Sequence, residues 1–414
     1  MTKQERSWIL YDVGNSAYTL IITATVLPIF FKNVAAQGLD SETSTAYWAY
    51  TNTAASLCVA LVAPVLGAMA DLKDFKKRLF MAFFAIGIVS TLALVAVQEG
   101  AWLTCAIIYA VSSIGFYGAV VFYDSFLVDV TDDERMDWIS ASGFAWGYIG
   151  SVLPFILVLG IVRMAPQLGI ETVTATRIGF VITATWWLLL TVPLLLNVRQ
   201  KHFLESSGNP VTESFARLFK TLSEIRHYRH VFLFLLAYFC YIDGVHTIIK
   251  MATVFGKDIG LTDNTLLMIF LVTQIVAFPS AIIYGMLAKT FTGKNMLLFG
   301  LVIYLGVTVF AYFVTSATEF WIMAILVGTA QGGIQALSRS YFAAIVPKTK
   351  AAQFFGFYDI FGKFAAVLGP LLVGIFTQVS GRVQSGVLSL IVLFLIGGGL
   401  LLLVPQPSRA SEAE

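Results

Sequence analysis

Three ionisable side chains share one face of an apolar segment in the second half of the chain. Asp243, His246 and Lys250 follow at i, i+3 and i+7, a spacing that places them on one side of an α-helix. A charge at the centre of a bilayer costs roughly 2.5–3.5 kcal/mol on insertion scales. We therefore expect these side chains to face a water-lined cavity, where they could bind a polar solute or exchange protons. A buried ion pair that only holds two helices together is the structural alternative.

The composition requires lipid as a solvent for most of the chain. Of the 414 residues, 58% are hydrophobic and only 12% are charged, whereas soluble domains carry about 25% charged residues. The net charge of +2 provides no basic surface of the kind that nucleic acid needs. We expect a multi-pass membrane protein that does not bind nucleic acid and whose first apolar helix is retained and not cleaved as a signal peptide.

Twelve segments are long and apolar enough to cross a bilayer, which takes about 20 residues. They are 8–32, 46–70, 79–97, 101–128, 138–162, 175–197, 231–256, 263–287, 295–315, 320–345, 354–378 and 385–404. A polar and basic stretch, 198–230, separates six segments from six and has room for a short surface helix. We expect an all-α membrane protein made of two six-helix bundles, 1–197 and 231–414, with 198–230 as a cytoplasmic linker. Lys and Arg gather on the side that holds both termini, so we place both termini in the cytoplasm.

The two halves of the chain resemble each other. The sequence GAMADLKDFKKR (67–78) ends the second segment, and GMLAKTFTGK (285–294) ends the eighth. Ala24-Thr25-Val26 likewise matches Ala252-Thr253-Val254, an alignment that sets Asn15 opposite Asp243 and Tyr18 opposite His246. Parallel six-helix halves related by an axis along the membrane normal are typical of major facilitator transporters, and we expect pseudo-symmetric bundles of that fold.

The loop 67–78 also resembles the signature that major facilitator proteins carry between their second and third helices, although Leu72 and Phe75 depart from it. The resemblance implies that Asp71, Lys76, Lys77 and Arg78 form part of a cytoplasmic gate. Ordinary positive-inside charge is the alternative. Four further motifs are similar to the vacuole-effluxer (autophagy-related permease-like) family: YDVGNSAY (11–18), DGVHTI (243–248), QALSRS (335–340) and FFGFY (354–358). The fungal member of that family is associated with efflux of amino acids from the vacuole, the bacterial members are largely of unknown substrate, and the compact chain resembles a bacterial member.

Other polar residues fall on the same faces as these motifs. Asp359 and Lys363 are spaced i, i+4 and can pair, and Asp124 and Arg339 could bridge the two halves or simply stabilise the fold. The residues expected to bind substrate are Asn15, Tyr18, Asp243, His246, Lys250, Gln331, Gln335 and Lys363. Those expected to couple protons are Asp12, Asp243, His246 and Asp359, and those of the gate are Asp71, Lys76, Lys77, Arg78, Asp124 and Arg339. The acidic run 129–137 is expected to be a solvated loop.

The combined expectation is a secondary transporter that moves a small polar solute, such as an amino acid or a related zwitterion or anion, by alternating access coupled to protons. No phosphate-binding loop or hydrolase motif occurs in the sequence, and we expect no enzyme activity, cofactor or metal. The expected partners are the solute, protons and the lipid of the inner (plasma) membrane, with the protein as a monomer. The alternatives are a facilitator or an exporter of lipid or another solute without proton coupling, and a non-transporting receptor or assembly factor.

Overall fold

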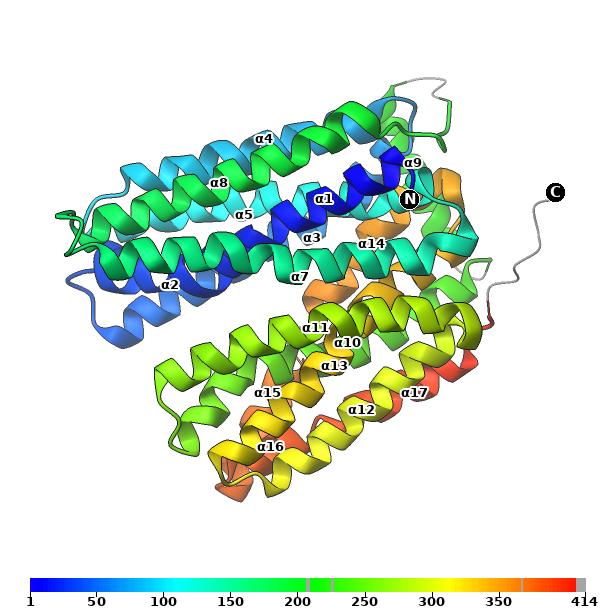
Figure 1. Ribbon diagram of the computed structural model, residues 1–414. Helices are drawn as coiled ribbons and strands as arrows, with labels where there is room; N and C mark the ends of the chain where they lie inside the picture. The colour runs from blue at the N-terminus through cyan, green and yellow to red at the C-terminus, as the bar shows by residue number, and fades with distance from the viewer. Residues whose placement is uncertain (206–208, 225–226, 366–367, 407–414) are drawn as a thin grey trace. The chain divides into compact units, whose positions relative to one another are not determined.

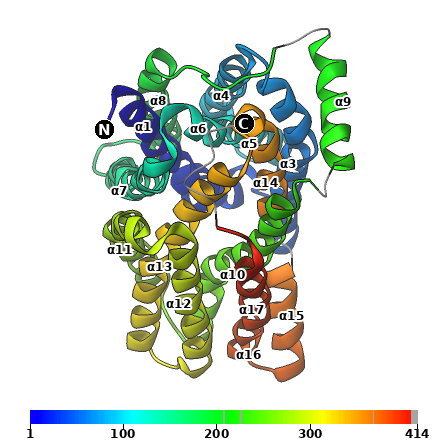
Figure 2. The same ribbon diagram turned by 90° about the vertical axis from the view of Figure 1, so that its right-hand side faces the viewer.

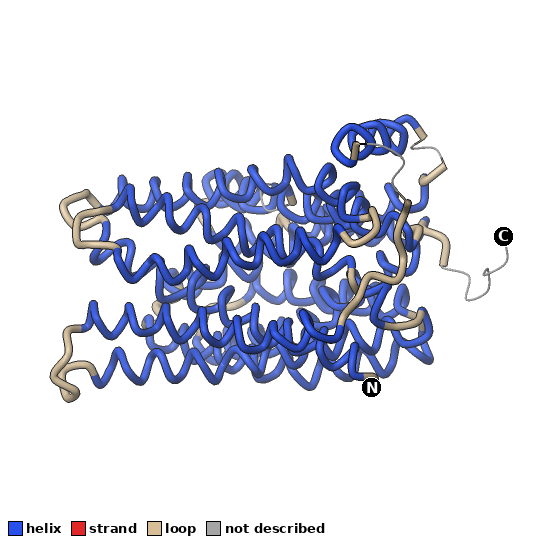
Figure 3. The backbone as a smooth tube through the Cα atoms, turned by 90° about the horizontal axis from the view of Figure 1, so that it is seen from above, coloured by secondary structure: helices blue, strands red, loops and turns tan. Residues whose placement is uncertain are grey.

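The structure is a computed structural model, and it describes residues 1–205, 209–224, 227–365 and 368–406. These residues are almost entirely helical (Figure 3). The described part of the chain holds twelve helical spans long and apolar enough to cross a membrane. The predicted all-α membrane fold with twelve spans is therefore confirmed. The linker residues 206–208 and 225–226 lie outside the described residues.

The first six spans are built from α1 to α8 (Figure 1). Their elements are α1 (Lys3–Tyr18), η1 (Thr19–Thr25), α2 (Val26–Phe30), η2 (Phe31–Ala35), α3 (Ser41–Ala70), α4 (Phe75–Ala93), η3 (Leu94–Ala96), α5 (Trp102–Ser125), α6 (Leu127–Val130), α7 (Asp133–Met164) and α8 (Thr172–Asn197). Helix α9 (Pro210–Ser223) follows in the linker. The chain enters α1 through a capping box, in which Thr2 and Glu5 satisfy each other's backbone N–H groups.

The last six spans are built from α10 to α17. Their elements are α10 (Arg229–Asp258), α11 (Asp263–Phe291), α12 (Gly293–Phe313), α13 (Ala317–Ile345), η4 (Lys348–Lys350), α14 (Ala351–Phe364), α15 (Leu368–Ser380), α16 (Val383–Leu388) and α17 (Ile391–Leu403). The span predicted as one helix, 354–378, is described as α14 and α15, and residues 366 and 367 between them lie outside the described residues. Pro370 stands in the first turn of α15, where its missing N–H costs nothing.

The chain folds into two compact units that exchange short segments. Unit 1 comprises Met1–Val130, Trp146–Phe215 and Thr349–Gly356. Unit 2 comprises Thr131–Ala145, Ala216–Lys348 and the chain from Phe357 onward. The start of α7 therefore belongs to unit 2, and the start of α14 belongs to unit 1.

Equivalent helices pair in the same way inside each unit. In unit 1, α1 packs against α8, and both α3 and α4 pack against α5. In unit 2, α10 packs against α17, and both α11 and α12 pack against α13 (Figure 2). Small residues permit the close approaches: a Cβ on Gly115 of α5 would lie 2.3 Å from the backbone nitrogen of Gly87 in α4. The repeat seen in the sequence is thus repeated in the packing.

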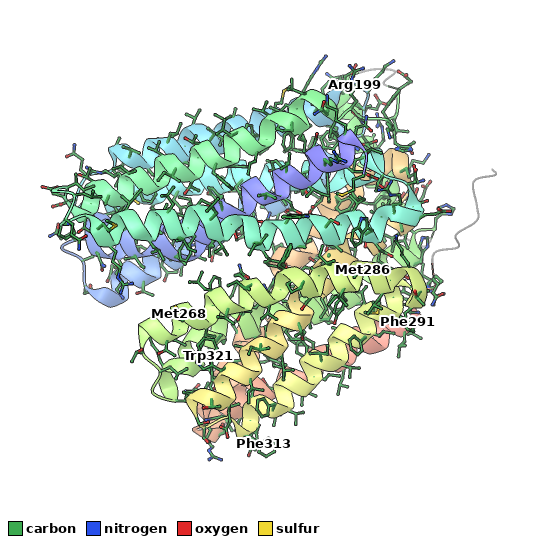
Figure 4. The ribbon with its side chains drawn as sticks, viewed as in Figure 1. Arg199, Met268, Met286, Phe291, Phe313 and Trp321 are labelled. Carbon is green, nitrogen blue, oxygen red and sulfur yellow. The ribbon has the colours of Figure 1, made fainter. Side chains whose placement is uncertain are left out.

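Large apolar side chains cover the outside of unit 2. Met268 and Phe291 on α11 and Phe313 on α12 are each more than half exposed and point away from the bundle (Figure 4). Apolar side chains exposed at this density suit the acyl chains of a bilayer and not water.

Candidate functional site

Asp243 lies at the centre of unit 2 and binds the beginning of α15. Its side chain is fully buried in α10. Carboxylate oxygen Oδ2 accepts a hydrogen bond of 2.7 Å from the backbone N–H of Gly369, and Oδ1 accepts one of 3.3 Å from the Thr247 hydroxyl. The first N–H groups of a helix have no partner within the helix, so the carboxylate serves as a cap for α15. Gly369 is required there, because a Cβ on it would lie 2.8 Å from Asp243 Oδ1.

His246 and Lys250 follow on the same helix and differ from Asp243 in exposure. His246 is half-buried and Lys250 is exposed. Among the residues that the structure describes, no carboxylate forms an ion pair with Lys250. Its ammonium group is therefore available to an anionic group from outside the chain.

An apolar pocket opens beside this stretch of α10, within unit 2. Its thirteen lining residues come from α10, α11 and α13. Small-molecule sites carry few polar groups among apolar ones. The polar lining here consists of Thr273, Gln274 and Gln331, and the apolar lining includes Ile248, Ile249, Ala252, Phe270 and Phe320. Gln331 thus lines this pocket, and Gln335, one turn further along α13, is half-buried.

Asp359 and Lys363 form the ion pair that their spacing predicts. The Lys363 ammonium contacts the Asp359 carboxylate one turn away on α14, and the two side chains are only 13% and 16% exposed. Lys363 is the last residue but one of α14.

Asp12, Asn15 and Tyr18 lie together in the interior of unit 1. All three side chains on α1 are buried. The Tyr18 hydroxyl shares a hydrogen bond of 2.9 Å with Ser112, and its ring stacks on Phe116. In this structure the tyrosine is part of the packed core of the N-terminal bundle.

Asp71 binds the N-terminus of α14 inside unit 1. Its carboxylate accepts hydrogen bonds from the backbone N–H groups of Ala352 (2.8 Å) and Gln353 (2.9 Å). The helices approach closely, since a Cβ on Gly67 would lie 2.2 Å from the Ala352 carbonyl oxygen. Burial raises the pKa of the Asp71 carboxyl to about 7, although Lys76 and the two N–H groups act to lower it.

Lys76 and Asp129 form a fully buried ion pair. The Lys76 ammonium lies 2.8 Å from Asp129 Oδ2, and both side chains are 0% exposed. Asp129 Oδ1 accepts the backbone N–H groups of Lys201 and His202, each at 2.9 Å, and contacts the His202 ring at 3.2 Å. Burial would raise the pKa of Asp129, but Lys76 and His202 outweigh it, so the pKa lies below its ordinary value. The prediction that 129–137 is a solvated loop is wrong, because Asp129 is buried in α6 and α7 already begins at Asp133.

The beginning of the linker is fastened to the same loop. Leu204 donates its N–H to the Asp71 carbonyl oxygen at 2.8 Å and accepts the N–H of Lys73 at 3.2 Å. The Lys77 ammonium donates to the Val198 carbonyl oxygen at 3.2 Å. Arg78 lies with its guanidinium over the Phe75 ring. Residues 198–205 thus form a strap that crosses the loop between α3 and α4.

Arg339 holds the beginning of α7 within unit 2. Its guanidinium donates to the Ser140 hydroxyl (3.0 Å) and carbonyl oxygen (3.1 Å) and stacks on the Phe144 ring. The adjacent Ser340 hydroxyl donates to Asp137. Asp124, its suggested partner, lies in α5 of unit 1.

The two loops of the internal repeat have equivalent backbone conformations and equivalent packing partners in their own units. Asp74 and Thr292 each stand seven residues after the first glycine of the loop, and both adopt a positive φ (65° and 68°). Among the described residues they are the non-glycine positions with that backbone. Gly67 meets α14 in unit 1, whereas Gly285 meets Ala141 of α7 in unit 2. Each loop therefore packs against the segment that its unit takes from the other half of the chain.

Solved structures define the class of protein to which this fold belongs. The proton:xylose symporter XylE has a TM-score of 0.72 and 13% identity, over 98% of this chain and 96% of that one. FucP, described in an outward conformation, has a TM-score of 0.71 and 14% identity, over 98% of each chain. The fold is that of major facilitator superfamily transporters.

Sequence comparison identifies the family within that class. The family model described as vacuole effluxer Atg22 like matches residues 1–414, and the chain belongs to this family. The MFS-type transporter YxiO of Bacillus subtilis (strain 168) is 49% identical over all of this chain and 97% of that protein. Autophagy-related protein 22-1 of Aspergillus niger is 27% identical over 64% of this chain and 47% of that protein. The predicted family is thus confirmed, as a bacterial member, and the chain is a membrane transporter of the MFS type.

Several residues of the site were not found from the sequence. Asp129 was hidden in an acidic run, and Gly369 was not considered. The pair Gly369-Pro370 within an apolar span was the available signal, because both residues disfavour a continuous helix. Thr273 and Gln274 gave only a weak signal, since isolated polar residues are common in helix–helix contacts.

Proposed function

We propose that the protein is a proton-coupled secondary transporter of a small zwitterionic or anionic solute, with an amino acid as the favoured class. It works as a monomer in the cell membrane with both termini in the cytoplasm. The observation that carries the proposal is a stretch of α10 beside an apolar pocket that contains amide groups. On this stretch lie a buried carboxylate and an exposed ammonium group that forms no ion pair within the described residues.

The solute class is supported by the chemistry of this stretch. Lys250 offers a positive charge for a carboxylate, and Gln274 and Gln331 offer amide groups within the pocket. The remaining lining is apolar and suits a hydrocarbon side chain. In this proposal His246, Gln335 and Lys363 complete the polar surroundings in unit 2, and Asn15 and Tyr18 are the candidates for contact with the solute in unit 1.

The coupling is supported by the contact between Asp243 and the beginning of α15. An ionised Asp243 caps α15 through Gly369, and protonation removes its charge, so the strength of this contact depends on the proton. The proton would therefore bias the geometry of α15 against α10. Asp359 lies in α14 and serves as a second acceptor, and Asp12 and His246 are the further candidates for proton exchange.

The gate is supported by the contacts of Asp71. Its carboxylate holds the first turn of α14, and the ion pair of Lys76 with Asp129 holds the loop that carries it. Release of α14 from Asp71 would free one end of a spanning helix to move. Lys77 and Arg78 support this loop. Arg339 holds the beginning of α7 as Asp71 holds the beginning of α14, and Asp124 is its candidate partner during the transport cycle.

A ligand screen by thermal unfolding tests the solute class. A ligand that binds only the folded protein raises its melting temperature by mass action. We expect amino acids with apolar side chains to raise it, and we expect Lys250→Ala to lose most of this effect. Stabilisation by sugars or nucleosides that is unchanged in Lys250→Ala would contradict the proposed class.

A further inference from the structure

Helix α9 differs from the spanning helices because its apolar residues lie along one side only. Val211, Phe215 and Phe219 follow at i, i+4 and i+8, which forms one stripe on a helix with 3.6 residues per turn. Glu213, Arg217 and Lys220 lie on the other side. A short helix with a strong apolar stripe and a basic polar face is typical of helices that lie in the plane of a membrane surface.

The exposure of α9 is the reverse of what a soluble helix would show. Val211, Phe215 and Phe219 are 50%, 45% and 67% exposed, while the small polar residues Ser214 and Thr221 are buried. In water, two exposed phenylalanines on one stripe would be unfavourable, because each buried aromatic side chain gains free energy from leaving water. The apolar stripe therefore needs an apolar environment.

The position of α9 in the chain limits what can supply that environment. Leu204 is held by backbone hydrogen bonds to the loop between α3 and α4, and Pro210 follows six residues later. Six residues span at most about 20 Å. At its other end, Ser223 is six residues before Arg229, where the spanning helix α10 begins. Both ends thus keep α9 near the level at which spanning helices leave the membrane, within reach of the bilayer surface.

The charges around α9 suit the headgroups of anionic lipid. Lys220 is exposed on the polar side of the helix, 4.0 Å from the Glu224 carboxylate, and Arg199, Lys201 and Arg229 are exposed in the flanking segments. Basic residues beside a membrane gain about 1 kcal/mol each from an anionic leaflet. In this arrangement the phenylalanine rings lie at the boundary of the acyl chains and the lysine ammonium group lies among the headgroups, so each side chain has a favourable environment.

We propose that α9 is a membrane-docking helix, which inserts Phe215 and Phe219 between the acyl chains of the leaflet that the linker faces and sets its basic residues among anionic headgroups. This binding surface is separate from the proposed solute site. Because the strap 198–205 connects α9 to the loop that carries Asp71, the docked helix would also anchor that loop to the lipid surface.

Spin labels on α9 test the proposal in the full-length protein. Phe219→Cys and Phe215→Cys report the apolar stripe, and Lys220→Cys is the matched control one residue away, in a background with Cys58, Cys105 and Cys240 replaced. In nanodiscs that contain anionic lipid, we expect the labels at 215 and 219 to be reached several-fold better by oxygen than by a water-soluble nickel complex. The label at 220 should show the opposite preference.

The other outcomes overturn the proposal. Equal access of the nickel complex to 219 and 220 would mean that α9 lies in water. Access of neither reagent to 215 and 219 would mean that protein covers the stripe. The labels should also lie deeper in anionic nanodiscs than in neutral ones, and equal depth would exclude the role of the basic residues.

Discussion

The buried ion pair of Lys76 with Asp129 allows a quantitative prediction. Neither side chain is exposed, so both charges depend on each other and on a few hydrogen bonds. Asp129→Asn keeps the size of the side chain and removes its charge, which leaves the Lys76 ammonium with the Ser125 carbonyl oxygen at 3.3 Å and the Phe126 ring. Loss of one partner of a buried pair costs about 3–5 kcal/mol. We expect the free energy of unfolding to fall by that amount.

An exposed pair in the same region is the matched control. Lys73 lies 3.5 Å from Glu205, and the two side chains are 54% and 73% exposed. Exposed pairs contribute about 0–1 kcal/mol, so Glu205→Gln should have little effect. Both variants are compared by denaturant unfolding in mild detergent, followed by tryptophan fluorescence.

The double variant Lys76→Met with Asp129→Leu separates loss of charge from loss of packing. Because the double variant removes both charges, it should lower the free energy of unfolding by less than the sum of Lys76→Met alone and Asp129→Leu alone. The difference should be roughly 2–3 kcal/mol. The reasoning would be refuted if Asp129→Asn cost no more than Glu205→Gln, or if the two single effects were additive.

Four further predictions concern pH, the gate and the contact of Asp243 with α15. The pKa of Asp129 is lower in the folded protein than its ordinary value near 3.9, so the stability that this carboxylate contributes should persist from pH 8 to about 4 and disappear below that. The free energy of unfolding should therefore fall below pH 4 in the wild type, and Asp129→Asn should lose this part of the decrease. Since Asp71 has a pKa of about 7 only while it is buried, acidification from pH 8 to 6 should favour its contact with α14. A maleimide should then label Gln353→Cys more slowly, relative to exposed Thr349→Cys; an unchanged ratio would remove Asp71 from this role. Gly67→Ala should increase the labelling of Gln353→Cys several-fold, because its Cβ would lie 2.2 Å from a backbone oxygen of α14, whereas Gly160→Ala, with no atom within 4 Å, should leave it unchanged. Gly369→Ala should destabilise the protein by about 1–3 kcal/mol through the displaced cap of Asp243, and Gly374→Ala on the same helix is the control with open space around it.

The family could be predicted from four sequence motifs, and the spans could be predicted because lipid imposes a simple rule. A bilayer requires about 20 apolar residues for each crossing, and each of the twelve segments shows this directly. The pairing of Asp359 with Lys363 also followed from local spacing, since residues four apart are neighbours on any helix.

The contacts of the site depend on tertiary structure and could not be predicted from local sequence patterns. Asp71 was expected in a gate, but its partners are backbone N–H groups 281 and 282 residues away, and backbone groups leave no mark in the sequence. Asp129 was misjudged for the same reason, because an acidic residue beside a loop is solvated unless a distant lysine approaches it. The π-helical turn Thr19–Thr25 in the first span also arises from packing and has no recognised local code.

Proton-driven accumulation in proteoliposomes tests the central claim most directly. With a solute found in the ligand screen, an imposed pH gradient should drive accumulation by the wild-type protein. Asp243→Asn should abolish this accumulation while it still exchanges solute across the membrane without a gradient. Accumulation by Asp243→Asn equal to that of the wild type would contradict the role of Asp243 in coupling, and transport by the wild type that does not respond to the gradient would contradict proton coupling itself.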